Sequence, residues 1–374
     1  MLLIYGANGY TGRLVVEECV RRGLRPILAG RHRAALEPLA HEYGLDLRVA
    51  ALASAHSARP RLTPPGTLPP SPPGELLAML DGVTVVLHCA GPFFRTSAVM
   101  VQACLETGAH YLDITGEIAV FEACRHRHAA ARQRDTVVLP GVGFDVVPTD
   151  CLAMRLAESL PGGSLLELAF AGGGGVSRGT LKTMLLNGGG GAIRRDGTIV
   201  PVPTAWRTRT IPFRDRQRTA VTIPWGDVST AQWSTRIPTI HTYIALPTAA
   251  RIGMRLQSLV QPFLDIPGTR RYLERQIDRR VAGPDAFVRS HATMQVWGRV
   301  THPDGRTIEG TAVTPEGYRF TAVAAVESAR RVLSAPPEPG YHTPATAFGS
   351  RFLESLPECS VELGPVSRGR STPS

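Results

Sequence analysis

The stretch Gly6-Ala7-Asn8-Gly9-Tyr10-Thr11-Gly12 decides the fold of the N-terminal region. It follows a short apolar run, Met1–Tyr5, typical of a buried parallel strand, and it opens a helical pattern over Thr11–Arg22. In such a loop the first glycine permits a sharp turn, the second lets a pyrophosphate approach the backbone, and the third lets helix and strand pack closely. Amides at the helix start would face the phosphates. The cofactor-binding residues expected here are Gly6, Asn8, Gly9, Tyr10, Thr11 and Gly12.

The second predicted strand, Leu24–Ala29, leads into Gly30-Arg31-His32-Arg33. Arg31 stands about 20 residues after the glycines, where an enzyme that prefers NAD carries Asp or Glu for the ribose hydroxyls. A planar guanidinium suits the 2′-phosphate of NADP instead. The sequence therefore favours NADP(H) over NAD, with Gly30, Arg31 and Arg33 as further cofactor contacts.

Strands and helices continue to alternate along the N-terminal region. Further strands are expected at Leu45–Ala51, Val83–Cys89, Tyr111–Ile114 and Thr136–Leu139, with helices at Ala34–Tyr43, Thr96–Thr107 and Glu117–Arg132. This alternation indicates βαβ units, hence an α/β Rossmann domain with a doubly wound parallel sheet over residues 1–150. One segment interrupts it: residues 54–74 contain seven prolines and are expected to form a Pro-rich surface loop.

The pattern changes after Pro148. Strand-like runs occur at Leu165–Phe170, Ile199–Val202, Thr219–Ile223, Ala292–Val300 and Thr307–Val313, and helical ones at Thr248–Leu264 and Tyr318–Leu333. Turns such as Pro303-Asp304-Gly305 join neighbouring strands, as in antiparallel sheets. We therefore expect a second, α+β domain of mixed or antiparallel sheet over residues 151–363, which holds the substrate or a partner. The polar tail, 364–374, is expected to be disordered.

Several motifs follow the later strands and extend into the second domain. They are Cys89-Ala90-Gly91-Pro92-Phe93, His110–Glu117, Pro140–Asp150, Gly174–Thr180, Pro224–Asp227 and Thr343–Gly349. Together with Gly6–Gly12 and Ala29-Gly30-Arg31, they resemble the saccharopine-dehydrogenase-like NADP-binding family, in a bacterial branch near the mycobacterial trans-acting enoyl reductases. The resemblance implies a Rossmann domain, a mixed-sheet domain and NADP-linked hydride transfer in the cleft between them.

The substrate stays open at this point. The resembling branch implies reduction of an enoyl thioester or related lipid intermediate, as a small molecule or bound to a carrier. Saccharopine-type reductive amination or dehydrogenation of an amino acid is the alternative. A third reading is a non-catalytic NADP-binding redox sensor, because no catalytic residue is obvious.

Candidate residues lie where later strands end. Cys89, Ala90, Gly91 and Pro92 follow the fourth strand, where doubly wound folds bind the nicotinamide half, and we expect them to contact the cofactor unless they form only a structural turn. Asp113 and Glu117 follow the next strand and either bind ribose or substrate or cap a helix. Tyr111 either supplies a proton or packs in the sheet. These last three, Tyr111, Asp113 and Glu117, are the candidates for catalysis.

Composition narrows the class of protein further. Of 374 residues, 43% are hydrophobic and 19% charged, which is typical of a globular chain, and no stretch is long and apolar enough to cross a membrane. Without a basic segment before an apolar core at the N-terminus, we expect a cytoplasmic protein. The histidines and six scattered cysteines show no metal-ligand spacing, so no metal is expected. Lys182 stands outside any G-x-x-x-x-G-K-[ST] pattern and is read as a solvated helix position.

The chain is basic, with 41 Lys and Arg against 31 Asp and Glu and a net charge of +10. Lys182 is the only lysine, and no nucleic-acid-binding pattern accompanies the arginines, so no nucleic-acid partner is expected. Residues 251–280 combine apolar and arginine side chains. This stretch either docks on an acidic carrier protein or a peripheral anionic membrane, or packs on its own domain. A homodimer also stays open.

Overall fold

A computed structural model describes residues 1–52, 62, 71–172, 190–255, 266–280, 283 and 285–368. The chain forms two compact units. The first contains Met1–Asp145 and Tyr318–Ala347, and the second contains the remaining described residues. This division differs from the expected consecutive domains 1–150 and 151–363, because the chain returns to the first unit near its C-terminal end.

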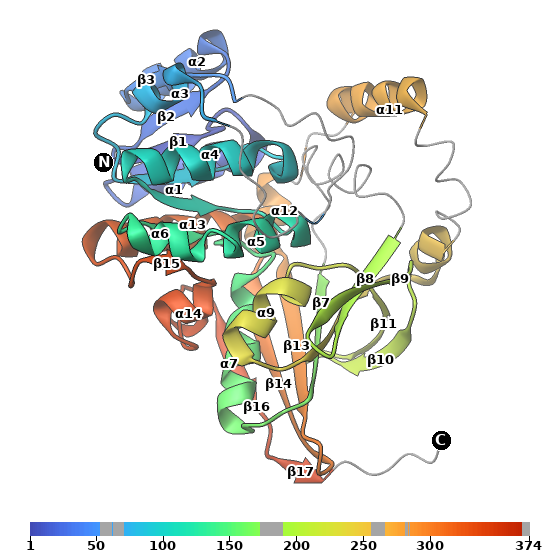
Figure 1. Cartoon of the computed structure of the whole chain (residues 1–374). Coiled ribbons are helices and arrows are strands. Elements are labelled where there is room, and N and C mark those ends of the chain that lie inside the picture. Colours follow the sequence, from blue (N-terminus) through green and yellow to red (C-terminus); the bar gives the residue numbers. More distant parts are fainter. Residues whose placement is uncertain are drawn as a thin grey trace. The chain divides into compact units, whose positions relative to one another are not determined.

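The first unit is built on a sheet of seven strands, all paired in parallel, in the order β15-β6-β5-β4-β1-β2-β3 (Figure 1). Its strands are β1 (Leu2–Tyr5), β2 (Ile27–Gly30), β3 (Leu47–Val49), β4 (Val85–His88), β5 (His110–Asp113), β6 (Val137–Leu139) and β15 (Gly340–Tyr341). Strands β1, β2 and β4 are buried along their whole length, as their unbroken apolar runs predict. The order reverses between β1 and β4, which is where doubly wound folds bind dinucleotides. The predicted Rossmann fold is confirmed.

Helices flank this sheet. They are α1 (Tyr10–Arg21), α2 (Arg33–Tyr43), α3 (Gly74–Met79), α4 (Phe93–Thr107), α5 (Ile118–Arg125), α6 (His128–Gln133) and α13 (Gly317–Ser334). Helix α4 packs beside α3 and α5. The single helix expected over Glu117–Arg132 is divided into α5 and α6 at His126 and Arg127.

Helix α13 shows why the C-terminal segment belongs to the first unit. Phe320 is 1% exposed and lies edge-on to Phe144, with ring centroids 6.0 Å apart. The Phe144 N–H donates to Thr321 Oγ1 at 3.0 Å. Glu327 pairs with Arg22, just after α1, at 2.9 Å. The periodicity of α13 predicts a buried face but not the partner of that face, so the sequence did not assign this helix to the first unit.

The second unit is built on a ten-stranded sheet whose main path runs β10-β11-β12-β7-β13-β14-β16. Its strands are β7 (Leu165–Gly172), β8 (Gly190–Arg195), β9 (Thr198–Pro203), β10 (Thr208–Pro212), β11 (Gln217–Thr222), β12 (Thr239–Ala245), β13 (Thr293–Thr301), β14 (Arg306–Pro315), β16 (Ser360–Leu363) and β17 (Ser367–Arg368). Among the described strands, β12 pairs with β7 in parallel and the other pairs are antiparallel. The predicted mixed sheet is confirmed. Residues 364–368 belong to the segment expected to be disordered, yet β17 pairs with β14.

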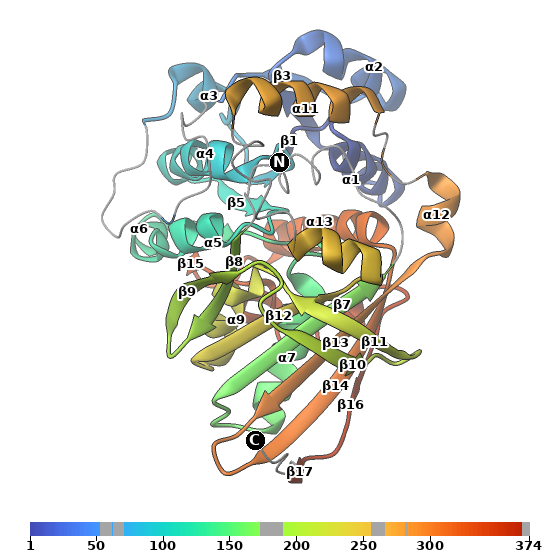
Figure 2. The same cartoon turned by 90° about the vertical axis from the view of Figure 1, so that its right-hand side faces the viewer.

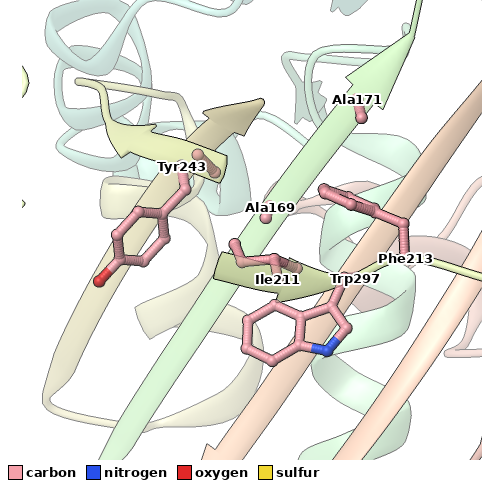
Figure 3. Close-up of a cluster of buried hydrophobic side chains, with 7 residues drawn as sticks. Ala169, Ala171, Ile211, Phe213, Tyr243 and Trp297 are labelled. Carbon is pink, nitrogen blue, oxygen red and sulfur yellow. The ribbon is translucent and has the colours of Figure 1, made fainter. Parts of the chain in front are cut away.

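The two faces of this sheet are covered differently. Helix α7 (Val147–Ser159) packs on one face, and α9 (Asp227–Thr235) packs beside α7. Gly298 permits this approach, because a Cβ there would lie 2.8 Å from Leu156 Cδ1 of α7. On the other face, Ile211 and Phe213 lie against Ala171 and Trp297 in a buried cluster (Figure 3). The hairpin of β10 and β11 thus folds across β7 and β13 (Figure 2).

Further helices are α11 (Pro267–Arg280), α12 (Ala286–His291), α14 (Pro344–Phe348) and η1 (Leu353–Ser355), and residues 248–255 are helical as predicted. None of the helices in the described ranges has the length and apolar character that a membrane crossing requires. Several sequence predictions fall outside the described residues: most of the Pro-rich segment 54–74, the motif Gly174–Thr180, Lys182, residues 256–265 and the tail beyond 368.

Candidate active site

The glycine turn after β1 has no room for side chains at its first and third positions. Gly6 adopts a φ of +85°, and a Cβ there would lie 2.8 Å from the Cβ of Ala90. A Cβ at Gly12 would lie 2.2 Å from the carbonyl oxygen of Gly6. The turn and the close contact between helix and strand therefore both require glycine. The contact with Ala90 joins the loops after β1 and β4 where the strand order reverses.

The second glycine has one close neighbour within the described part of the chain. A Cβ at Gly9 would lie 3.2 Å from the Gly6 carbonyl oxygen. Gly9 is the N-cap of α1, and no side chain caps this helix. The first hydrogen bond within the helix runs from Arg13 N–H to Gly9 O at 2.9 Å, so the amides before Arg13 lie at the open end of α1. This geometry fits a dinucleotide pyrophosphate, because a helix N-terminus attracts anions.

The other predicted cofactor contacts gather at the carboxyl end of the same strands. Asn8 lies beside Gly30, with its Oδ1 3.5 Å from where a Gly30 Cβ would be. Cys89 N–H donates to Tyr5 O at 2.7 Å, which fixes the start of the loop 89–92. Arg31 is exposed directly after β2, as a contact to a ribose phosphate requires.

Two residues predicted to contact the cofactor, Arg33 and Tyr10, also contact other residues of the protein. Arg33 is the first residue of α2, and its guanidinium lies 4.0 Å from Glu37 with 63% of its side chain exposed. The ring of Tyr10 packs edge-on against Tyr318 of α13, at 5.0 Å between centroids. Tyr10 would therefore meet a cofactor through its backbone at the start of α1.

Tyr111 and Asp113 form a buried structural pair. Both are 0% exposed, and the Tyr111 hydroxyl donates to Asp113 Oδ2 at 2.7 Å. Asp113 Oδ1 also accepts the N–H groups of Thr115 at 3.0 Å and Gly141 at 2.9 Å. Burial raises the pKa of Tyr111, and it raises the pKa of Asp113 to about 6. The pair connects the loop after β5 to the loop after β6. Of the two roles considered for Tyr111 from the sequence, this geometry fits packing within the sheet.

Glu117 is the N-cap residue of α5, as the sequence suggested, but its side chain caps α4. It is 5% exposed, and its two oxygens accept the N–H groups of Phe93 and Phe94, each at 2.9 Å. These amides begin α4. Burial raises its pKa to about 7. Glu117 thus holds the start of α4 against the loop after β5.

His88, at the end of β4, was not singled out from the sequence. It is 0% exposed, and its Nε2 lies 2.9 Å from Thr96 Oγ1, whose hydroxyl donates to Ala90 O at 2.9 Å. Burial lowers the pKa of His88 to about 3, so the imidazole is neutral at pH 7. His88 therefore holds the loop 89–92 in place through Thr96. The apolar run of β4 gave no sign of this role, because a single histidine hardly changes a strand pattern.

Asp145 is the second residue that sequence reasoning did not single out. It follows β6, and part of the residue is exposed although its carboxyl group is surrounded by protein. Its Oδ2 lies 2.4 Å from where a Cβ of Gly116 would be, so the glycine makes room for the carboxylate. Within the described part of the chain, no group donates a hydrogen bond to this carboxylate. Burial raises its pKa to about 7, and its charge contributes to the raised pKa of Glu117. The sequence signal that could have identified Asp145 was Gly143-Phe144-Asp145, which lies within the motif Pro140–Asp150.

The described residues contain no group of three His, Cys, Asp or Glu side chains that could hold a metal ion. The arrangement at the carboxyl edge of the first sheet therefore consists of a glycine turn, an exposed arginine after β2, a supported loop after β4 and a carboxyl group that titrates near neutrality. Such a set can bind a dinucleotide and hold a proton beside it.

Comparison with known proteins agrees with this reading. Residues 2–139 match the family model described as the saccharopine dehydrogenase NADP binding domain. A lipid droplet localized protein of Caenorhabditis elegans is 27% identical, with 93% of this chain and 94% of that protein covered. A trans-acting enoyl reductase of Mycobacterium leprae is 31% identical over 41% of this chain and 35% of its own length.

Among solved structures, a saccharopine dehydrogenase (L-Glu forming) of Saccharomyces cerevisiae is similar with a TM-score of 0.62 and 10% identity, over 97% of this chain and 99% of that one. At this identity the likeness concerns the fold. It extends over both units, whereas this chain matches only about a third of the length of the mycobacterial protein. Residues 2–139 are therefore similar to the saccharopine dehydrogenase NADP binding domain, and the fold of the chain is similar to that of a saccharopine dehydrogenase.

Proposed function

We propose that this protein uses NADPH to reduce an unsaturated or carbonyl carbon of an acyl thioester or a related lipid intermediate. The proposal rests on the helix start at Gly9, which follows β1, together with the carboxyl group of Asp145, which follows β6 in the same sheet and has a pKa of about 7. The substrate class is supported by the two relatives, one named for lipid droplets and one for enoyl reduction.

Bound NADPH would supply a hydride. The chain's own residues would position the cofactor and supply the proton. Arg31 would pair with the 2′-phosphate, and the loop 89–92 would lie beside the nicotinamide half. Reduction of an enoyl thioester adds the hydride at Cβ and a proton at Cα, and Asp145 in its protonated form would donate that proton. A carboxyl group with a pKa of about 7 is half protonated near neutral pH, which suits a general acid.

The test is NADPH oxidation with the purified chain and a substrate panel. One arm holds enoyl and ketoacyl thioesters of several chain lengths, and the other holds keto acids with amino-acid amines. We expect turnover with the thioesters and none with the second arm. Turnover in the amine arm alone would favour saccharopine-type chemistry, and NADPH binding without turnover in either arm would favour a redox sensor.

We also propose that residues 251–280 place the protein at an anionic lipid surface. Three large apolar side chains of this stretch are exposed: Ile252 at 53%, Ile266 at 51% and Tyr272 at 59%. Arg275 and Arg279 are exposed on α11 as well. Arginines beside exposed apolar groups suit an anionic interface.

Co-sedimentation with phosphatidylglycerol vesicles at low and high salt tests this docking. We expect binding that weakens as salt increases, and loss of binding in Arg275→Glu/Arg279→Glu with NADPH affinity unchanged. No binding at low salt would contradict the docking. Binding to an acidic acyl carrier protein instead of vesicles would assign the stretch to a carrier.

A further inference from the structure

A cluster of arginines and aromatic rings lies in the second unit, away from the glycine turn in the sequence. We call Arg195, Trp206, Arg207, Arg209 and His241 the Trp206 cluster. The guanidinium carbon of Arg207 lies 4.2 Å from the centroid of the Trp206 ring, and that of Arg195 lies 5.9 Å from it. The His241 ring stands edge-on to the same indole, with 5.7 Å between centroids. One indole is thus contacted by two cations and an imidazole.

Strand register brings these residues together. Strand β8 pairs with β12 through Arg194 and Ile240, so Arg195 and His241 lie on the same face of the sheet. Arg194 points the opposite way and donates from Nε to Val228 O of α9 at 2.7 Å. The Trp206 cluster therefore lies on the face that does not pack against the helices. Trp206 itself lies between β9 and β10.

The cluster carries more positive than negative charge. Arg209 forms an ion pair with Glu167, which is opposite His241 on β7. Arg195 and Arg207 are exposed, and no carboxylate of the described chain forms an ion pair with either of them. The charged groups that act on His241 are Glu167, Arg207, Arg195 and Arg209, hence three cations and one anion. The net positive charge of the site therefore comes from the guanidinium groups of Arg195 and Arg207.

His241 adds a buried polar atom without a partner. Its side chain is buried, at 5% exposure, and its Nδ1 has no hydrogen-bond partner among the residues that the structure describes. Burial lowers the pKa of His241, with the three arginines acting in the same direction, so the ring is neutral at pH 7. A neutral imidazole can offer an N–H from Nδ1, and leaving this atom unpaired in a buried position is unfavourable. A ligand with acceptor oxygens would satisfy it.

We infer that the Trp206 cluster binds a phosphate group of a ligand. A guanidinium stacked on an indole keeps its N–H edge free for two parallel hydrogen bonds to phosphate oxygens. Two such groups match the two negative charges of the diphosphate of coenzyme A. The inference deepens the proposed function, because thioesters of coenzyme A and of carrier proteins bear a phosphate on the pantetheine arm. A lipid headgroup would present the same chemistry.

The binding test uses calorimetry on the full chain in saturating NADP⁺, so that the dinucleotide site does not compete. The probes are coenzyme A, inorganic phosphate and phosphatidylglycerol vesicles. We expect coenzyme A to bind the wild type and Arg195→Ala/Arg207→Ala to weaken it about 10- to 100-fold, with NADP⁺ affinity and melting temperature unchanged. Arg216→Ala, an exposed arginine outside the cluster, is the matched control and should bind as the wild type does.

A kinetic arm separates this inference from the proposed function. For a coenzyme A thioester, the double variant should raise KM and leave kcat unchanged. For the N-acetylcysteamine thioester, which lacks phosphate, KM should not change. Equal coenzyme A affinity in wild type and double variant would overturn the inference, even if thioesters are reduced. Weakened binding of coenzyme A without turnover of any thioester would support the site and contradict the proposed function. Weakened binding of vesicles alone would assign the phosphate to a lipid headgroup.

Discussion

The two candidate ligand sites are built from different parts of the chain. In the first unit, the glycine turn presents backbone amides, and the nearby carboxylates Asp113 and Glu117 hold the loops in place through backbone N–H groups. In the second unit, the Trp206 cluster presents long side chains from the face of a sheet. The first site depends on backbone shape, and the second depends on side-chain charge.

The difference has a consequence for mutation. A backbone site fails when a side chain is added, because the added atoms occupy the space of the ligand. A side-chain site fails when side chains are removed, and the strands beneath it stay paired.

Asp145→Asn should reduce kcat about 10²- to 10⁴-fold, because it removes the proposed proton donor. NADPH affinity should stay the same, since the substitution adds no bulk. In the wild type, kcat should fall as pH rises through about 7, where the acid loses its proton. The variant should lack this dependence. Steady-state rates between pH 5.5 and 8.5 are the measurement, with Asp135→Asn as an exposed control. An unchanged pH profile in Asp145→Asn would assign the proton to another group.

Gly9→Asp should weaken NADPH binding at least about 100-fold while the fold persists. Its side chain would lie at the start of α1 with the same sign of charge as the pyrophosphate. Gly12→Ala should instead lower the melting temperature, because its Cβ overlaps the Gly6 carbonyl oxygen. Gly74→Ala, which meets no atom within 4 Å, is the control for both. Fluorescence titration and thermal melting are the measurements, and tight NADPH binding by a folded Gly9→Asp variant would remove the turn from the site.

The same contrast explains what the sequence could predict. The turn Gly6–Gly12 and strands β1 to β6 of the first sheet were predictable, because each is a local pattern of a few residues with its own spacing, whereas the two-residue strand β15 was not predicted. Asp145 lay inside a quoted motif, but its raised pKa comes from burial, which no spacing encodes. The Trp206 cluster could not be predicted from the sequence, since Arg195 and His241 are brought together only by the register of β8 and β12. Neither strand was predicted, because β8 is rich in Gly and Arg and β12 reads as an apolar run between prolines.

Arg31→Ala should weaken NADPH about 10- to 100-fold and leave NADH nearly unaffected, since only NADPH carries the 2′-phosphate. Arg33→Ala should have a smaller effect, because its guanidinium already lies near Glu37. Titration of both cofactors against the three proteins measures this. Equal losses for NADPH and NADH in Arg31→Ala would show that Arg31 acts on the fold of the loop and not on the phosphate.

The smallest expected effect is on stability. A carboxyl group whose pKa is higher in the folded than in the unfolded state favours folding most below its unfolded pKa, near 4, and this contribution is lost as pH rises through the folded value. For Asp145 the window runs from about 4 to about 7. Asp145→Asn removes the cost of burying the charge, so it should be more stable relative to the wild type at pH 8 than at pH 5, by about 1–2 kcal/mol.

Urea unfolding of both proteins at the two pH values measures this difference. Buried histidines such as His88, whose pKa is lowered, change stability in the opposite direction over the same range, but they are common to both proteins and cancel. Asp135→Asn, at an exposed position, should show no difference that depends on pH. If the difference between Asp145→Asn and wild type stays constant from pH 5 to pH 8, then Asp145 ionises normally in the folded protein. Its carboxyl group would then be a base at neutral pH, and the proton for reduction would have to come from elsewhere.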